Sequence, residues 1–186
     1  MTALKNDQPG EFTSPNEVRL VRLLPGPIER IWEFLTDPEK RARWFAGGTM
    51  EPRTGGKMHL VFRHSNLAPD EVPPTEYAEV HNKGRTMDGR VLRWEPPRVL
   101  SYTFGSTADS DVTFDLTPQG NQVLLVVTHR SRGEDIPDLP NFGSGWHSHL
   151  GLLIALLEGK PRPPFWPTHA RLLADYSHEY AGKFST

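Results

Sequence analysis

The sequence of 186 residues contains no cysteine. Without thiols, the chain cannot form disulfide bonds, use a cysteine nucleophile or bind a metal through cysteine sulfur. Basic residues are not in excess either, because 21 Lys and Arg stand against 23 Asp and Glu, which gives a formal net charge of -2. Since nucleic-acid binding depends on neutralising phosphates, we do not expect DNA or RNA as a partner.

Long apolar segments are also missing. The longest uninterrupted apolar run, Leu152 to Leu157, is far shorter than the roughly 20 residues that a membrane-spanning helix needs. Residues 1–16 are polar and lack the apolar stretch of a secretory signal. We therefore expect no membrane span, a flexible leader over residues 1–16 and a cytoplasmic location.

Several common signatures of catalysis do not occur. The phosphate-binding G-x-x-x-x-G-K-[ST], the dinucleotide-binding G-x-G-x-x-G and the nucleophile motif G-x-S-x-G are all missing. We interpret Gly143-Ser144-Gly145 as the cap of a helix. His147 and His149 are two residues apart, and such a pair points to different faces of a helix and does not converge on a metal. We predict no catalytic residue, no metal site and no cofactor.

The first part of the chain has the pattern of one strand followed by two short helices. Residues 17–24 alternate in the manner of a strand. Pro27 suits the first turn of a helix, and apolar residues then recur at helical spacing over 28–35. Asp37-Pro38 is a second start signal, for a short helix that ends near Phe45.

Short strand-like segments separated by turn signals follow. Connections this short suit antiparallel neighbours, because parallel pairing needs a crossover of a dozen or more residues. Together with the first strand they predict an antiparallel sheet of about six strands, and 77–81 could add a short edge strand. The further strands are 57–63, 90–94, 99–104, 111–116 and 122–130.

A long apolar helix is predicted after the strands. Trp146, Leu150, Leu153 and Leu157 follow helical spacing, and other leucines widen this stripe over most of the helix surface. Such a helix should be heavily buried, with Gly159 as its stop signal. Residues 160–186 read as a Pro-rich tail with room for a short helix.

Short sequence motifs spread over residues 17–159 resemble those of the START-like (Bet v 1-like, SRPBCC) superfamily. The closer similarity is to the branch that contains the C-terminal domain of the Hsp90 ATPase activator. Each motif alone is weak, but their order and spacing are specific. The residues that carry the resemblance are Arg22, Pro27, Ile31, Trp32, Leu35, Thr36-Asp37-Pro38, Trp44, Gly55-Gly56, Gly89, Val91, Glu95-Pro96-Pro97, Leu100-Ser101-Tyr102-Thr103, Val112-Thr113-Phe114, Thr128-His129 and Gly145-Trp146.

The resemblance implies an α+β helix-grip fold over residues 17–159, a curved antiparallel sheet around a long C-terminal helix with a cavity between them. Two stretches depart from the usual pattern of this branch: 64–86 is longer, and the tail 160–186 runs past the point where many members end. We interpret them either as mobile surface excursions or as a lid or homodimer contact, since Phe165 and Trp166 need cover.

Ligand sites are apolar concavities with few polar groups, so the prediction is that the cavity binds a small hydrophobic or aromatic molecule. The residues expected to line it are Trp32, Trp44, Phe62, Trp94, Tyr102, Phe104, Phe114, Trp146, His149, Leu150 and Leu153. An enzyme of cyclase or hydrolase type is one alternative, with His149, Tyr102, His59 and Arg22 as candidate acids or bases. A chaperone-associated interaction domain is the other.

Overall fold

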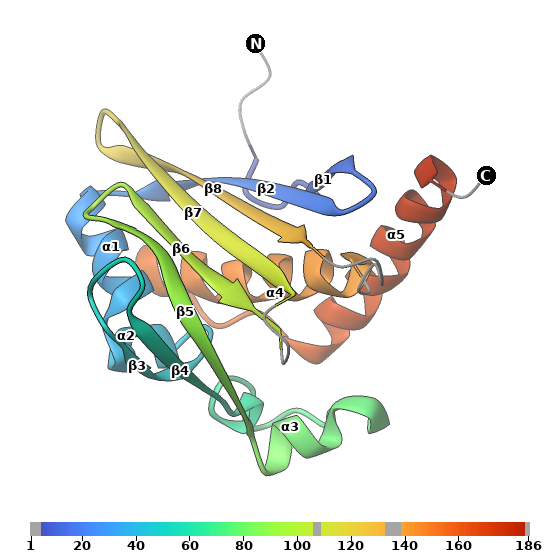
Figure 1. The fold of residues 1–186 in the computed structure, drawn as a ribbon. Helices are drawn as coiled ribbons and strands as arrows, with labels where there is room; N and C mark the ends of the chain where they lie inside the picture. Colours follow the sequence, from blue (N-terminus) through green and yellow to red (C-terminus); the bar gives the residue numbers. More distant parts are fainter. Residues whose placement is uncertain (1–4, 106–108, 133–138, 185–186) are drawn as a thin grey trace.

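The computed structural model describes residues 5–105, 109–132 and 139–184. Its main feature is one eight-stranded antiparallel sheet with the strand order β1-β2-β8-β7-β6-β5-β4-β3 (Figure 1). The strands are β1 (Glu11–Ser14), β2 (Glu17–Pro25), β3 (Gly47–Met50), β4 (Lys57–Phe62), β5 (Arg85–Glu95), β6 (Val99–Phe104), β7 (Ser110–Gln119) and β8 (Gln122–Ser131).

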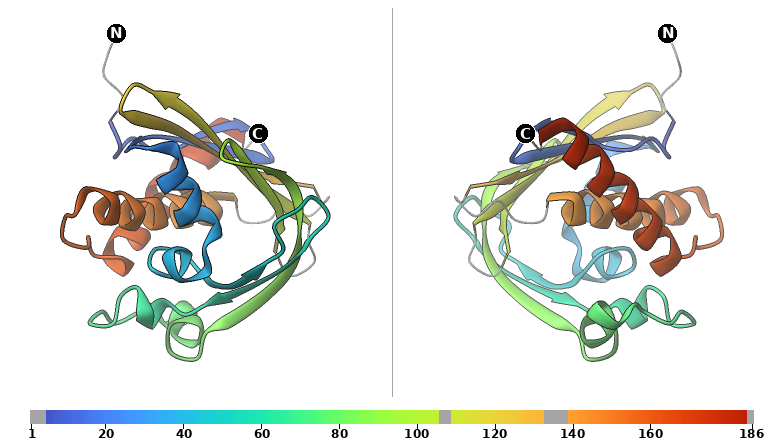
Figure 2. Two further views of the ribbon diagram at one scale, coloured as in Figure 1. Left: turned by 90° about the vertical axis from the view of Figure 1, so that its left-hand side faces the viewer. Right: turned by 90° about the vertical axis from the view of Figure 1, so that its right-hand side faces the viewer.

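The sheet curves around the helices, which lie on its concave side (Figure 2). The longest helix, α4, runs under the middle of the sheet, and α1 and α2 lie toward one end of it (Figure 1). The helical elements are α1 (Ile28–Thr36), α2 (Pro38–Ala42), the short 3-10 turns η1 (His64–Asn66) and η2 (Thr75–Tyr77), α3 (Ala78–Asn82), α4 (Leu139–Glu158) and α5 (Trp166–Phe184).

Alternation along the strands decides which face is concave. In β7, Val112, Phe114 and Leu116 are buried, and the residues between them are only half-buried. Leu125 and Val127 of β8 face the same way and are fully buried. Burying one apolar face of an antiparallel sheet against a helix is the main source of stability in such a layer.

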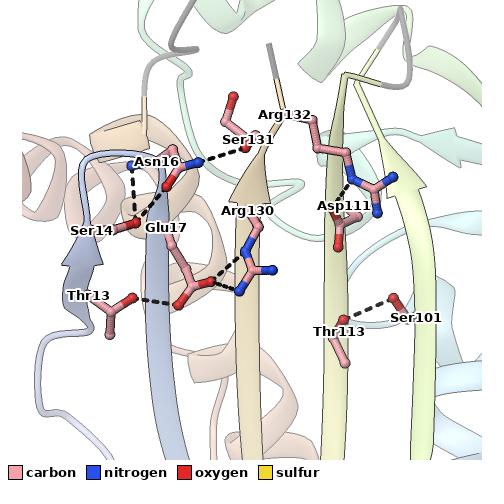
Figure 3. A network of polar contacts seen from close by, with 10 residues as sticks. All are labelled: Thr13, Ser14, Asn16, Glu17, Ser101, Asp111, Thr113, Arg130, Ser131 and Arg132. Atoms are coloured by element: carbon pink, nitrogen blue, oxygen red, sulfur yellow. Dashed lines mark hydrogen bonds and ion pairs between the residues drawn. The ribbon is translucent and has the colours of Figure 1, made fainter. Parts of the chain in front are cut away.

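The outer face carries polar pairs that join neighbouring strands (Figure 3). Arg130 of β8 donates from Nε to the carboxylate of Glu17 on β2 at 2.7 Å, and the two residues are direct register partners. Arg132 likewise donates to Asp111 at 2.6 Å. Opposite charges placed across a strand pair stabilise its register by a few tenths of a kcal/mol, up to about 1 kcal/mol.

The α+β class, the antiparallel sheet and the long buried helix are as predicted, but the strand count and the placement of the short helices are wrong. The sheet has eight strands because β1 and β3 were missed. β3 contains two glycines, and β1 has Phe12 as its only large apolar residue, so neither has a strong strand pattern. The two short helices therefore follow the second strand.

Two further predictions need correction. The stretch 77–81, predicted as an edge strand, forms the end of η2 and part of α3. Helix α4 begins at Leu139, so Ser144 lies inside it and donates its hydroxyl hydrogen to the carbonyl of Asn141 at 3.0 Å. The interpretation of 143–145 as a cap is therefore wrong.

The N-terminal and C-terminal segments contain more regular structure than was predicted for a leader and a tail. β1 lies within residues 1–16, and α5 occupies 19 residues of the segment 160–186. Phe12 of β1 packs edge-to-face on Tyr176 and Tyr180 of α5, with ring centroids 5.8 and 5.0 Å apart. The Tyr176 hydroxyl also accepts a hydrogen bond from the backbone N–H of Gly10.

The inserted segment, which we define as residues 64–84, is fastened to the start of α5 by a carboxylate. Both oxygens of Glu71 accept from the backbone N–H of Phe165, at 3.0 Å or less, and one also accepts from Trp166 at 2.8 Å. Arg162 pairs with both Asp70 and Glu71. This Glu71 clasp satisfies N–H groups that the first turn of a helix cannot pair internally.

A chain of hydrogen bonds crosses the core between sheet and helix. The indole N–H of Trp146 donates to Nδ1 of His129 at 3.0 Å, so the neutral imidazole carries its hydrogen on Nε2. Nε2 lies 3.1 Å from the Ser110 hydroxyl, which itself donates to the Phe104 carbonyl at 2.9 Å. Burial lowers the pKa of His129 to about 3.

No helix among the described ranges is long and apolar enough to cross a membrane. The cytoplasmic location stays a prediction.

The Glu71 clasp predicts a measurable loss of stability in Glu71→Gln. Hydrogen bonds to charged groups each contribute about 1.5–3 kcal/mol, so the variant should unfold at a temperature several degrees lower in a circular-dichroism melt. Asp70→Asn is the matched control, because Asp70 pairs with the same arginine but is largely exposed. Equal melting of both variants and the wild type would contradict the clasp.

The clasp should also weaken in acid. Burial alone would raise the pKa of Glu71, but the N–H of Phe165, Arg162 and the N–H of Trp166 together lower it below its usual value. A carboxyl group whose pKa is lower in the folded state than in the unfolded state stabilises the fold at pH values above its unfolded-state pKa. This stabilisation is lost as the pH falls through the folded-state pKa. The stability difference between wild type and Glu71→Gln should therefore shrink below the usual glutamate pKa.

The buried neutral His129 predicts a second pH dependence. The unfolded chain binds a proton at this residue below about pH 6.5, whereas the folded chain does so only near 3. Stability should therefore fall as the pH drops through this window, by up to about 1.4 kcal/mol per pH unit for this residue. His129→Gln should show a flatter slope of unfolding free energy against pH than the wild type in urea titrations. His178→Gln, at an exposed position of α5, is the control for the exchange of a histidine for a glutamine.

Candidate functional site

A cavity of about 840 Å³ lies between the sheet and the N-terminal half of α4. One wall comes from the ends of β4, β5 and β6, and the helix contributes residues one turn apart, among them Gly145 and His149. The inserted segment and the start of α5 form the opposite wall. The aromatic residues among its lining are Phe45, Phe62, Tyr77, Phe104, Phe142, Trp146, Phe165 and Trp166.

Phe45 is the centre of the aromatic wall on the sheet side. Its ring lies 4.9 Å from that of Trp146, and 5.2 Å from that of Phe62 at nearly a right angle. Phe104 adds an edge-to-face contact with Phe62 at 6.4 Å. Offset and edge-to-face rings of this kind fix one another's orientation, so this side of the cavity is preformed.

The opposite wall depends on residues that are about ninety positions apart in sequence. Tyr77 of the inserted segment stacks on Trp166 of α5 with ring centroids 5.2 Å apart. The indole N–H of Trp166 donates to Nδ1 of His81 at 3.1 Å. The Glu71 clasp brings these two segments together, so it also positions this wall.

His149 is the buried polar residue of α4 that lines the cavity. Its Nδ1 lies 2.8 Å from the carbonyl oxygen of Trp44. A carbonyl oxygen only accepts, so Nδ1 carries the hydrogen and Nε2 carries the lone pair. Burial, aided by the nearby His64, lowers the pKa of His149 to about 3, although the bond to Trp44 acts in the opposite direction. The imidazole is uncharged at neutral pH.

His64 faces His149 from the inserted segment, with ring centroids 5.4 Å apart. Burial lowers its pKa to about 4, and the positive charges that His81 and His169 can carry add to this effect. Its Nδ1 is buried and has no hydrogen-bond partner among the residues that the structure describes. Two neutral imidazoles therefore lie side by side in this wall at pH 7.

The structure brings four of the eleven predicted ligand residues to the cavity: Phe62, Phe104, Trp146 and His149. The other seven lie elsewhere in the core. Trp32 and Trp94 pack edge-to-face on each other at 5.2 Å, and Trp44 donates its indole N–H to the carbonyl of Phe34 at 2.9 Å. The remaining residues, all fully or almost fully buried, are Tyr102, Phe114, Leu150 and Leu153.

The four residues considered for acid–base chemistry do not converge. His59 pairs with Asp88 at 2.7 Å on an exposed part of β4 and β5. Arg22 is buried in β2, where Nη1 donates to the carbonyl of Val21 at 2.8 Å. Tyr102 lies in the core, and burial raises its pKa. Within the described ranges, no group of three or more histidines and carboxylates is placed to hold a metal ion.

Sequence reasoning missed Phe45 on the sheet side of the cavity and most of the opposite wall. Phe45 falls at the end of a short helix, and Tyr77, His64 and Phe165 lie in the two stretches that depart from the family pattern. The sequence predicts a lid or a dimer contact in those stretches, because Phe165 and Trp166 are large apolar residues that should be buried. That signal pointed to the correct segments but not to the individual side chains.

Comparison with known proteins gives the relationships of this chain. The family model described as "Activator of Hsp90 ATPase homolog 1-like protein" matches residues 25–158. Comparison with curated proteins found no match.

Solved structures of similar proteins share the fold. The protein encoded by gene BPP1335 of Bordetella parapertussis is 41% identical, with a TM-score of 0.76 over 87% of this chain and 85% of that one. CalU16 from Micromonospora echinospora is 23% identical, with a TM-score of 0.64 over 91% and 89%. DynU16, from the dynemicin biosynthetic locus, is 21% identical (TM-score 0.56), and the match covers 81% of this chain but only 51% of DynU16.

A family match over most of the chain, a relative with two-fifths identity and the curved sheet around α4 all agree: this chain belongs to the Activator of Hsp90 ATPase homolog 1-like family, within the START-like superfamily that its motifs resemble.

Proposed function

We propose that this protein binds a small hydrophobic or aromatic molecule in the cavity between the sheet and α4. The observation that carries the proposal is the cavity itself, about 840 Å³ with an aromatic lining. This volume lies within the range of roughly 300–1,000 Å³ that is usual for small-molecule sites. Aromatic walls provide large contact areas whose geometry is set before the ligand arrives.

Gly145 supports this interpretation from the helix side. It lies in α4 and lines the cavity, and a methyl group built on its Cα would meet no atom within 4 Å. A glycine in the middle of a helix costs about 1 kcal/mol relative to alanine. Its presence at a position of α4 that lines the cavity keeps the cavity wide where a side chain would narrow it.

The same geometry favours binding over proton transfer. A general base works best when its pKa is near the operating pH, and His149 is held near 3. Its Nδ1 is also committed to the Trp44 carbonyl. His149 is therefore better suited to accept a hydrogen bond from a ligand than to remove a proton from one.

We propose that the inserted segment and α5 act as one wall over the cavity. The support is that the two segments contact each other through the Glu71 clasp and through Tyr77 and Trp166. On this view the ligand-binding unit extends beyond residues 17–159 and includes α5.

The test is a titration with Nile red, an uncharged probe whose fluorescence rises in apolar surroundings. The wild type should bind it saturably with one site per chain. Gly145→Leu places a side chain into the cavity and should weaken binding at least about tenfold, which corresponds to about 1.4 kcal/mol. The substitution should not lower the melting temperature, since leucine favours helix more than glycine does.

Gly182→Leu is the matched control, because Gly182 lies in α5, and there too an added Cβ meets no atom within 4 Å. It should bind Nile red as the wild type does. Equal binding by the wild type and Gly145→Leu would place the probe outside the cavity and contradict the proposal.

A further inference from the structure

The hydrogen bonds around the cavity determine which polar groups remain for a ligand. Two indole N–H groups belong to its lining, and both are already used: Trp146 donates to His129 at 3.0 Å, and Trp166 donates to His81 at 3.1 Å. The hydroxyl of Tyr77 donates to the side-chain oxygen of Asn141 at 3.0 Å. The aromatic donors of the wall therefore serve the protein rather than a ligand.

His149, in contrast to these donors, offers a ligand a hydrogen-bond acceptor. Its Nδ1 hydrogen is fixed on the carbonyl of Trp44 at 2.8 Å, so its second nitrogen, Nε2, is an acceptor in the neutral ring. Nε2 has no hydrogen-bond partner among the described residues. The residue is 6% exposed and lies against Phe45 and Phe165, with ring centroids 5.1 and 4.9 Å away. A ligand that reaches His149 can satisfy Nε2 only by donating a hydrogen.

The charges around the cavity disfavour an acidic ligand. Its rim carries the carboxylates of Glu76, Glu79 and Asp109 and one guanidinium, Arg85, all on exposed residues. The imidazoles of His64 and His149 deeper in the wall are uncharged at pH 7. A carboxylate placed beside them would lose its hydration without gaining a cation, and this is costly.

We propose, resting on the proposed binding function, that the cavity selects uncharged aromatic molecules that carry an O–H or N–H group. His149 is the positioning residue that accepts this hydrogen at Nε2. The aromatic wall binds the ring system, and Nε2 of His149 sets its orientation. The charged residues of the lining are mostly acidic, with Glu76, Glu79 and Asp109 against Arg85, and this discriminates against carboxylates.

Three probes with one ring system test this ligand class by calorimetry at pH 7: 2-naphthol, 2-methoxynaphthalene and 2-naphthoate. The first can donate a hydrogen bond, the second cannot, and the third is an anion. Since a neutral hydrogen bond contributes about 0.5–1.5 kcal/mol, 2-naphthol should bind about three- to tenfold more tightly than 2-methoxynaphthalene. The naphthoate should bind at least about tenfold more weakly than 2-naphthol, because its charge is desolvated without a partner.

His149→Asn separates the acceptor from the packing. The asparagine amide can keep a donor toward the Trp44 carbonyl but has no equivalent of Nε2. The variant should bind 2-methoxynaphthalene as the wild type does and lose the preference for 2-naphthol. His178→Asn, at an exposed position of α5, is the matched control and should keep the preference.

The outcomes are distinguishable. If 2-methoxynaphthalene and Nile red bind but 2-naphthol has no advantage, or if 2-naphthoate binds best, the ligand class is wrong and the binding function stands. If the preference for 2-naphthol persists in His149→Asn, the positioning role is wrong. If none of the three probes nor Nile red binds, both proposals fail.

Discussion

The cavity exists because a straight helix lies in a curved sheet, and only one half of the helix fills the space beneath it. In the C-terminal half of α4, Leu150 and Leu153 are fully buried and Leu157 nearly so. These leucines pack against the apolar concave face. In the N-terminal half, Gly145 lines the cavity, and a Cβ built on it would meet no atom within 4 Å. The distribution of large and small residues along one helix therefore determines where the protein is solid and where it is hollow.

The open half would be a wide cleft without the inserted segment and α5. The inserted segment provides Tyr77 and His64, and α5 provides Phe165 and Trp166. Their contact depends on one partly buried carboxylate, Glu71, which accepts from two backbone N–H groups and pairs with Arg162. A wall joined by one clasp and a few ring contacts is the kind of element that opens locally at lower free-energy cost than the core. Ligand entry through this side is consistent with that difference.

Some polar groups in the interior are fully paired by hydrogen bonds. Arg41 is 1% exposed, yet its guanidinium donates to the carbonyls of Thr36, Ala46, Gly47 and Gly48 and fixes the turn that leads from α2 into β3. His129 is satisfied on both ring nitrogens. His149 differs from His129, because only its Nδ1 forms a hydrogen bond within the described residues, and it lines the cavity. His64, whose buried Nδ1 has no partner among the described residues, faces His149 in the lining of the same cavity.

Much of the fold could be predicted because its signals are local. The alternation in β7, the stripe of α4 and the Asp37-Pro38 start signal depend on neighbours in sequence, and Asp37 does accept from the N–H of Glu39 and Lys40. The site could be predicted only in part. Trp44, Tyr102 and Phe114 belong to the core, whereas Phe62 and Phe104 line the cavity. All five are aromatic residues that face inward, and no local sequence pattern separates the two groups. That distinction depends on where segments ninety residues apart meet.

The account is tested most directly by a crystal structure of the protein soaked with 2-bromonaphthalene, using the anomalous signal of bromine. The account predicts a single strong bromine peak between the sheet and α4, beside Gly145 and Phe45, with Phe165 and Trp166 on the other side. Density showing this space filled by the protein's own side chains, with bromine bound elsewhere or not at all, would contradict it.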